Sequence, residues 1–190
     1  MVKINKIYTR TGDRGSAGLV DGSRISKSSA RMTAIGEVDE ANSAIGVAIA
    51  ALDQGELADR LRAIQNELFD LGADLATPFG TDIEAHALRI VARQAARLEE
   101  EIDAMNASLE PLTSFILPGG SEAVALLHQA RCIVRRAERA AVALNEETPI
   151  NVDALAYLNR LSDHLFVAAR HVAAGQDGDV LWRPGATRAI

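Results

Sequence analysis

Leucine-type residues recur along most of this chain at alternating steps of three and four positions. These steps place the apolar side chains on one side of an α-helix, in the pattern typical of helices that pack nearly parallel in a bundle. Five segments carry the pattern: residues 35–52, 57–75, 88–109, 121–146 and 152–174. The sequence therefore predicts about five long helices joined by short loops.

Helix boundary signals agree with these segments. All five prolines lie outside the periodic stretches, as expected for a residue that rarely occurs inside a helix. Thr81 and Glu84 have the spacing of a capping box ahead of the third helix. Ser121 and Asn151 are the predicted N-caps of the last two helices, and Gly175 is placed to end the final one.

The start of the chain has a different character, because glycines crowd it at positions 12, 15, 18 and 22. Residues 1–28 are predicted to form a short strand or extended lead, followed by a glycine- and serine-rich loop. Residues 29–175 are assigned to the helical bundle and residues 176–190 to a C-terminal tail, within one domain that spans 1–190. The predicted fold class is all-α: a five-helix bundle with a glycine-rich N-terminal loop.

Composition supports helix over sheet and narrows the function classes. Of the 190 residues, 48% are apolar, 24% are charged and only 4% are aromatic. The net charge of −6 argues against a general nucleic-acid or membrane-surface binder. The single cysteine, Cys132, excludes an intrachain disulfide, and its apolar helical surroundings predict a small core residue. With no secretory signal and no apolar stretch of bilayer length, we expect a soluble, cytoplasmic protein.

One helical segment carries a charged face that could bind an anion. Arg131 and Arg135 are four residues apart and Glu138 follows three later, so all three share one side of the helix. Two arginines one turn apart repel each other unless an anion lies between them, and the guanidinium fork suits phosphate or carboxylate oxygens. The alternative is a solvated face with intrahelical ion pairs, such as Arg135 with Glu138, and for an arbitrary helix this alternative is favoured.

The N-terminal loop is a second candidate for anion binding. Residues 8–18 read Tyr-Thr-Arg-Thr-Gly-Asp-Arg-Gly-Ser-Ala-Gly, and Ser23, Ser26 and Lys27 follow. Clustered glycines let backbone N–H groups converge on an anion, and hydroxyl and cationic side chains surround them. The loop is neither a Walker A motif nor a dinucleotide-binding fingerprint. Taken alone, an ordinary flexible loop is the favoured interpretation.

The remaining polar and aromatic positions leave their interpretations open. Phe115 lies in an apolar connector, residues 115–120, and taken alone is more simply a core residue. Asn159 and Asp163 share a face of the last helix, and Asp39 and Asn42 interrupt the apolar stripe of the first helix. Such polar residues on a core-facing helix form either a structural hydrogen-bond network or a functional site. The four histidines have no metal-ligand spacing, so a di-iron bundle is unsupported. No nucleophilic triad is recognisable either.

Five of these motifs together resemble the PduO-type ATP:cob(I)alamin adenosyltransferases, a family of corrinoid adenosyltransferases. They are the loop 9–15, Gly-Glu-Val-Asp-Glu-Ala-Asn-Ser at 36–43, Phe-Ile-Leu-Pro-Gly-Gly at 115–120, the arginine segment 130–139, and Tyr-Leu-Asn-Arg-Leu-Ser-Asp at 157–163. Each motif is weak alone, but they occur in the family's order over essentially the whole chain. The match is therefore specific.

The resemblance implies a homotrimer of five-helix bundles with active sites between subunits, and it implies ATP, Mg²⁺ and a corrinoid. Asp39 resembles the family's partner for Arg131 across the subunit interface, and Phe115 resembles the residue that crowds the lower face of the corrin. With Arg135, these residues form the expected catalytic set. The ATP-binding residues implied by the resemblance are Thr9, Arg10, Thr11, Gly12, Asp13, Gly15, Ser16, Lys27, Arg135, Glu138, Arg139 and Asn159.

Three positions depart from the family pattern. Arg10 stands where lysine is common, which keeps the positive charge. Ala17 lies where a threonine hydroxyl is frequent, so one contact to phosphate or metal is lost from the pattern. Ala41 replaces a usual leucine, which implies a change in packing.

The chemistry implied by the resemblance fits the residue inventory. Co(I) attacks the 5′ carbon of ATP and triphosphate leaves, so the nucleophile needs no deprotonation and no general base is required. The protein must orient two reactants and hold the charge of the leaving triphosphate. Further implied partners are a cobalamin reductase and an adenosylcobalamin-dependent enzyme, with no nucleic acid and no membrane. The alternative is a non-catalytic helical module that binds nucleotide or corrinoid, or serves in protein interaction.

Overall fold

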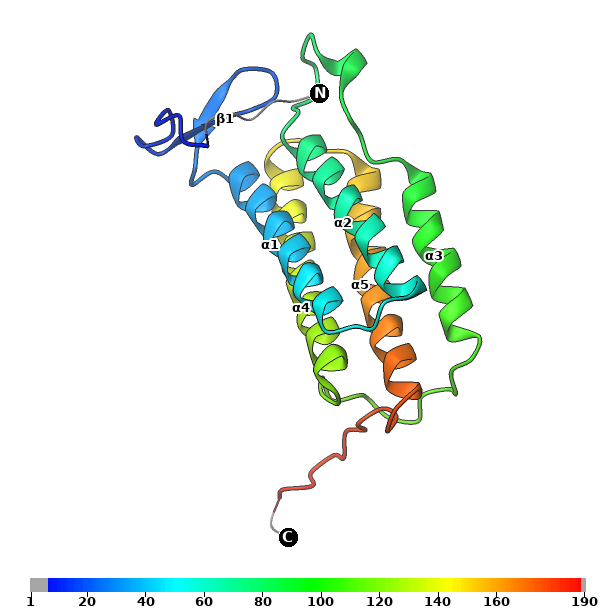
Figure 1. The fold of residues 1–190 in the computed structure, drawn as a ribbon. Coiled ribbons are helices and arrows are strands. Elements are labelled where there is room, and N and C mark those ends of the chain that lie inside the picture. The colour runs from blue at the N-terminus through cyan, green and yellow to red at the C-terminus, as the bar shows by residue number, and fades with distance from the viewer. Residues whose placement is uncertain (1–6, 189–190) are drawn as a thin grey trace.

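The chain folds as a bundle of five α-helices (Figure 1), which confirms the predicted fold class. The computed structural model describes residues 7–188, so the parts of the predicted N-terminal loop and tail at 1–6 and 189–190 lie outside the described residues. Helix α1 packs against both α2 and α4, while α5 packs against α4 and α3. The bounds are α1 Ala30–Ala50, α2 Glu56–Leu75, α3 Ala92–Asn106, α4 Glu122–Glu147 and α5 Val152–Ala174.

The periodic apolar positions form the core between these helices. Leu61 and Leu68 of α2, Leu127 of α4, and Leu158 and Leu165 of α5 are all buried. Alanines occupy many of the remaining inward positions, which lets helix backbones approach closely without leaving voids. Within residues 7–188, no helix combines the length and the apolar character needed to cross a membrane.

The glycine-rich start contains a small sheet that the sequence did not specify. Strands β1 (Ser16–Gly18) and β2 (Arg24–Ser26) pair in antiparallel fashion, with Ala17 opposite Ile25. The hairpin lies at the end of the bundle where α1 begins and α2 ends (Figure 1). The backbone N–H of Val20 donates to the carbonyl oxygen of Ala76 at 3.1 Å, which fastens the hairpin to the end of α2.

The predicted start of the third helix is wrong. Thr81 and Glu84 do not form a capping box; a single 3₁₀ turn, η1 (Glu84–His86), follows them, and α3 begins only at Ala92. The Glu84 carboxylate pairs instead with Arg89 at 3.0 Å, so it is not available to cap a helix. Leu88, expected in the buried stripe, lies before the helix and is 52% exposed.

The other predicted caps lie where expected. Asn151 caps α5, because its Oδ1 accepts a hydrogen bond from the backbone N–H of Asp153 at 3.1 Å. Gly175 ends that helix. Ser121 occupies the N-cap position of α4, although its side chain makes no capping hydrogen bond.

A buried carboxylate holds together the end of the bundle that carries the hairpin. Asp74, near the end of α2, is only 2% exposed. It accepts hydrogen bonds from Arg89 Nη1 at 2.7 Å, from the backbone N–H of Ile90 at 2.8 Å and from Asn151 Nδ2 at 2.7 Å. One side chain thereby joins the last turn of α2, the loop before α3 and the N-cap residue of α5.

Replacing Asp74 by alanine should lower the free energy of unfolding by about 3–5 kcal/mol, because it strands a partly buried guanidinium and two other donors. Thermal and urea unfolding followed by circular dichroism measure this loss. Asp59→Ala provides the matched control: its carboxylate pairs with Arg62 at 2.7 Å on the surface, so its loss should cost less than about 1 kcal/mol. Equal losses in the two variants would show that Asp74 does not have this role.

Candidate functional site

The N-terminal loop folds into a tight turn that ends at β1. The backbone N–H of Gly15 donates to the Gly12 carbonyl oxygen at 3.1 Å, and that of Lys27 donates to the Gly15 carbonyl oxygen at 2.9 Å. Gly15 has φ +80°, a left-handed backbone conformation that residues other than glycine rarely adopt. The glycine at this position is therefore a requirement of the turn.

Two cationic side chains contact this turn: Arg24, the first residue of β2, and Lys27, which directly follows β2. A Cβ atom added to Gly12 would lie 3.0 Å from Lys27 Nζ, so the ammonium group rests directly on the glycine. Arg24 donates from Nη2 to the carbonyl oxygen of Thr11 at 2.7 Å and to Ser16 Oγ at 2.8 Å. Lys27 was predicted as a site residue, whereas Arg24 was missed because it belongs to none of the motifs recognised in the sequence.

Beside the turn lies an open hollow of about 630 Å³, lined by Arg10, Thr11, Asp13, Arg14 and Arg24. Three of the five lining residues are arginines, which gives the hollow a positive character suited to an anion. Arg10 has φ +61° and lies over the ring of Tyr8, with 5.6 Å from Cζ to the ring centroid. The structure thus gathers the predicted loop residues in one place.

The predicted charged face of α4 is present, but it does not contain the intrahelical ion pair between Arg135 and Glu138 that the alternative interpretation predicted. Glu138 Oε1 accepts a hydrogen bond from Asn159 Nδ2 of α5 at 2.8 Å, and no ion pair joins Glu138 to Arg135 within residues 7–188. Arg139 Nη1 donates to the backbone carbonyl oxygen of Arg135 at 3.0 Å. The guanidinium of Arg135 is exposed and makes no ion pair with any residue that the structure describes.

Arg131 lies further down α4, against α5. Its guanidinium carbon is 6.0 Å from the ring centroid of Phe166, and its Nη2 is 3.7 Å from Cys132 Sγ. Cys132 itself is exposed, so its assignment to the core is wrong: it lies on a side of α4 that the chain's own helices leave open. Burial, and to a smaller extent the Arg131 charge, lower the pKa of the adjacent His128.

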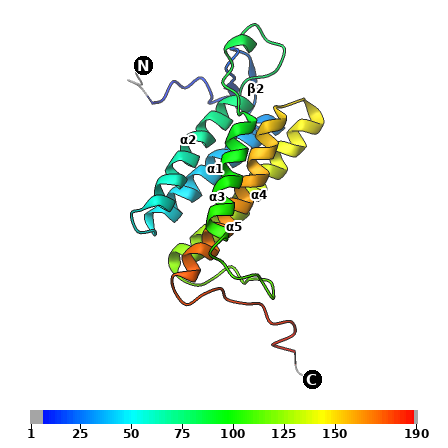
Figure 2. The same ribbon diagram turned by 90° about the vertical axis from the view of Figure 1, so that its right-hand side faces the viewer.

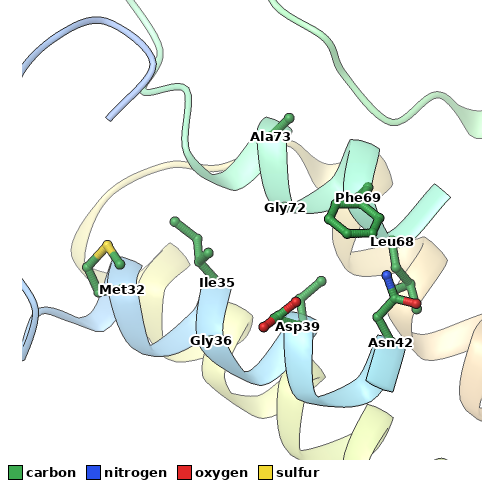
Figure 3. A pocket seen from close by; sticks show the side chains of 10 residues that line it. Met32, Ile35, Gly36, Asp39, Asn42, Leu68, Phe69, Gly72 and Ala73 are labelled. Carbon is green, nitrogen blue, oxygen red and sulfur yellow. The ribbon is translucent and has the colours of Figure 1, made fainter. Parts of the chain in front are cut away.

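Asp39 lies in a different place, the groove between α1 and α2 (Figure 3). The groove has a volume of about 530 Å³ and is mostly apolar, with Phe69 standing 71% exposed at its wall. Within residues 7–188, Asp39 has no ion pair with Arg131. Asn42 lines the same groove, and its Nδ2 donates to the carbonyl oxygen of Gln65 at 3.0 Å, which joins the two helices.

Phe115 is not a core residue: its side chain is 77% exposed, in the loop between α3 and α4. The predicted tail pairs with this loop. The backbone N–H of Trp182 donates to the Phe115 carbonyl oxygen at 2.8 Å, and Ser114 Oγ donates to the Trp182 carbonyl oxygen at 2.8 Å. The two rings meet edge to face, with centroids 6.0 Å apart. Trp182 was missed, although the only tryptophan of the chain is itself a signal.

The candidate residues are therefore distributed along the bundle. The N-terminal hairpin lies at one end, and the Phe115 loop with the C-terminal tail lies at the other (Figures 1 and 2). Helix α4, whose 26 residues span about 39 Å, connects the two ends and carries the arginines between them. Within residues 7–188, no three His, Cys, Asp or Glu side chains are placed to share a metal ion.

Comparisons with known proteins agree on one family. The family model described as cobalamin adenosyltransferase matches residues 7–172. A corrinoid adenosyltransferase of Mycobacterium tuberculosis is 52% identical over 190 residues, covering 98% of this chain and 97% of the relative. A corrinoid adenosyltransferase of Bacillus subtilis is 47% identical over 180 residues, covering 92% of this chain and 91% of the relative.

Solved structures give the same result. A phenylalanine-to-alanine variant of a PduO-type ATP:corrinoid adenosyltransferase from Lactobacillus reuteri, complexed with cobalamin and ATP, superposes with a TM-score of 0.88. It is 40% identical and covers 94% of this chain and 99% of its own. An arginine-to-lysine variant from the same organism, complexed with ATP, superposes with a TM-score of 0.85 at 39% identity, covering 93% of this chain and 100% of its own.

Proposed function

The chain belongs to the cobalamin adenosyltransferase family, and from this premise we propose how its own residues carry out the reaction. The protein transfers the 5′-deoxyadenosyl group of ATP to cob(I)alamin, giving adenosylcobalamin and triphosphate. The match of the family model over residues 7–172 is the observation that carries this conclusion. The alternative of a non-catalytic module is not favoured by any feature of the described residues.

The triphosphate of ATP binds between the N-terminal hollow and the charged face of α4. The loop contributes backbone N–H groups, the Ser16 hydroxyl and the Lys27 ammonium group, while Arg135 and Arg139 supply charge from α4. The exposed, unpaired guanidinium of Arg135 supports this role, since it is available to an anion. The full set proposed for ATP is Thr9, Arg10, Thr11, Gly12, Asp13, Gly15, Ser16, Lys27, Arg135, Glu138, Arg139 and Asn159.

The residues around the hollow fit Mg²⁺ bound through the nucleotide. Mg²⁺ commonly takes one or two carboxylates together with phosphate oxygens and water. Asp13 is the only acidic residue that lines the hollow, so it is the carboxylate that would help to hold the ion. The ion would neutralise part of the charge on the triphosphate, and the arginines and Lys27 neutralise more of it.

The corrinoid is proposed to bind against Phe115, at the other end of α4 in the same chain. Because Co(I) must contact the 5′ carbon of ATP, this Phe115 belongs to a different subunit of the proposed trimer from the N-terminal loop that binds the triphosphate. An apolar ring that is 77% exposed is well placed to exclude water and the lower axial ligand from the cobalt. Loss of that ligand makes Co(II) easier to reduce to the nucleophilic Co(I). Because Co(I) attacks carbon directly, the protein needs no general base; it positions the two reactants and stabilises the leaving triphosphate.

We propose a homotrimer in which the active sites lie between subunits. Asp39 lies in the α1–α2 groove, whereas Arg131 lies against α5, so their opposite charges are separated within one chain. A neighbouring copy that covers the apolar groove would pair Asp39 with the partner's Arg131. An interface of this head-to-tail kind closes into a ring when the rotation between copies permits it.

Two further partners are proposed from the chemistry of substrate and product. The corrinoid reacts as Co(I), so a cobalamin reductase must supply the electron to Co(II). The product is a cofactor, so an adenosylcobalamin-dependent enzyme must accept it. Neither partner requires a nucleic acid or a membrane.

The activity is tested by mixing the protein with ATP, Mg²⁺ and chemically reduced cobalamin and following the corrinoid absorbance for adenosylcobalamin. Arg135→Ala should lose about 2–4 kcal/mol of transition-state stabilisation, by analogy with the loss of one oxyanion donor, while its melting curve stays unchanged. If the wild type is active and the turnover of Arg135→Ala lies within about twofold of it, Arg135 is a surface charge with no role in catalysis. An inactive wild type that binds ATP would instead favour the non-catalytic module.

Asp39→Asn should weaken the trimer, because it leaves the partner's Arg131 without its counter-charge in a partly buried interface. Sedimentation velocity over a dilution series measures the assembly, and turnover should fall in parallel with it. Glu40→Gln is the matched control: Glu40 is on the same helix but pairs with Arg136 inside the chain, so assembly should persist. A fully active monomeric wild type would overturn the interface.

Phe115→Ala should affect the reduction of Co(II) rather than ATP binding. The variant should lose most of its rate when a mild reductant acts on enzyme-bound Co(II)cobalamin, and recover part of it when Co(I) is made beforehand with a strong reductant. Leu88→Ala removes an apolar side chain that is 52% exposed near the opposite end, and should behave as wild type with both reductants. Equal losses of rate for Phe115→Ala with both reductants would contradict the role of Phe115 at the lower face of the corrin.

A further inference from the structure

Arg24 makes more hydrogen bonds to the N-terminal turn than any other side chain that the structure describes. Its Nη2 donates to the carbonyl oxygen of Thr11 at 2.7 Å, to the carbonyl oxygen of Ser16 at 3.0 Å and to Ser16 Oγ at 2.8 Å. Its Nε donates to the same hydroxyl at 3.2 Å. These bonds join the two ends of the turn, and Arg24 itself is held in β2 by pairing with Gly18.

We propose that Arg24 is a positioning residue for the N-terminal loop. By binding the loop's hydrogen-bond acceptors, it keeps them away from the triphosphate and leaves the loop's donors facing it. The inference rests on the proposed function, in which this loop binds the triphosphate. It adds a residue that the recognised motifs do not include and gives it a distinct role.

The acceptors that Arg24 engages are the groups that would repel a triphosphate. A carbonyl oxygen carries partial negative charge, so the oxygens of Thr11 and Ser16 must not face phosphate. Arg24 binds both of them, and the guanidinium offsets their charge. Two acceptors are thereby removed from the surface that would face an anion, which favours binding through N–H groups in the manner of other backbone anion sites.

The Ser16 hydroxyl is oriented by the same contact. A hydroxyl has one donor hydrogen and two acceptor lone pairs. Two N–H groups of Arg24 approach its acceptor side, at 2.8 and 3.2 Å, which leaves the O–H hydrogen to be donated elsewhere. Ser16 is therefore set as a donor to a phosphate oxygen before the nucleotide arrives, and that preorganisation lowers the cost of binding.

Arginine is required for this task, since a lysine carries the same charge without the geometry. The guanidinium is planar and presents its N–H groups in a fixed fork, whereas an ammonium group is a single point of charge on a flexible stem. Arg24 is also exposed, and exposed hydrogen bonds add little to the stability of a fold. The arrangement is therefore better explained by ligand binding than by folding.

The test compares Arg24→Met and Arg24→Lys by steady-state kinetics in full-length protein. We expect both variants to raise KM for ATP by about tenfold or more, the scale of one charge-assisted contact, with kcat at saturating ATP within about threefold of wild type. KM for the corrinoid and the melting temperature should not change. Restoration of the ATP KM to within about twofold by lysine would show that only charge matters, and would overturn the positioning role.

The link through Ser16 is tested by a double-mutant cycle. Ser16→Ala should raise the ATP KM, and adding it to Arg24→Met should cost less than the sum of the separate effects, because Arg24 acts partly through that hydroxyl. Inorganic triphosphate should lose affinity for Arg24→Met in parallel with ATP, while adenosine should not. Strict additivity, or an equal loss for adenosine, would contradict the proposal.

Two further variants separate this proposal from the assignment of the loop itself. Lys27→Met should raise the ATP KM if the loop binds the triphosphate; an unchanged value would overturn that assignment and the role of Arg24 with it. A raised value for Lys27→Met beside an unchanged value for Arg24→Met would overturn the role of Arg24 alone. Arg62→Met is the matched control for loss of an arginine, because Arg62 pairs with Asp59 on α2, and its ATP KM should stay within about twofold of wild type.

Discussion

The buried carboxylate of Asp74 is the interaction on which the geometry at the hairpin end of the bundle depends. It neutralises Arg89 and satisfies two further donors, and so it fixes where α2 ends. The carbonyl groups that follow are then used by other segments: Leu75 accepts from the Arg31 side chain of α1, and Ala76 accepts from the hairpin at Val20. The hairpin that follows the glycine-rich loop is thus fastened to the end of α2, and α1 is fastened to the same end.

The proposed reaction accounts for candidate residues that are spread over the length of a helix rather than gathered in one cluster. A transfer that needs no proton abstraction does not need a compact group of titratable side chains. It needs one region that binds a highly charged leaving group and another that excludes water from a metal centre, and these two environments are chemically opposed. Because Co(I) must contact the 5′ carbon of ATP, the two regions that react in the proposed trimer belong to different subunits: the cationic loop of one chain meets Phe115 of another, although the two lie at opposite ends of each bundle.

The sequence predicts the bundle well, because burial of an apolar face is a property that each helix carries in its own periodicity. It fails at the start of α3, where Leu88 continues the apolar pattern but the Arg89–Glu84 ion pair holds the chain in a loop. The α4 face could be predicted from the spacing of Arg131 and Arg135. The contacts of Arg24 and Trp182 could not be predicted, because Arg24 lies in no recognised motif and Trp182 pairs with a loop that is distant in the sequence.

The contact between Trp182 and Phe115 has a spectroscopic consequence. Trp182 is the only tryptophan of the 190 residues, so the indole fluorescence of the protein arises at one point, 6.0 Å from the ring assigned to the corrinoid end. A corrin is a strong chromophore whose absorption overlaps indole emission, so a bound corrinoid would accept excitation energy from this side chain. The chain therefore contains its own optical reporter of occupancy, without any label and with no second emitter of the same kind to obscure the signal.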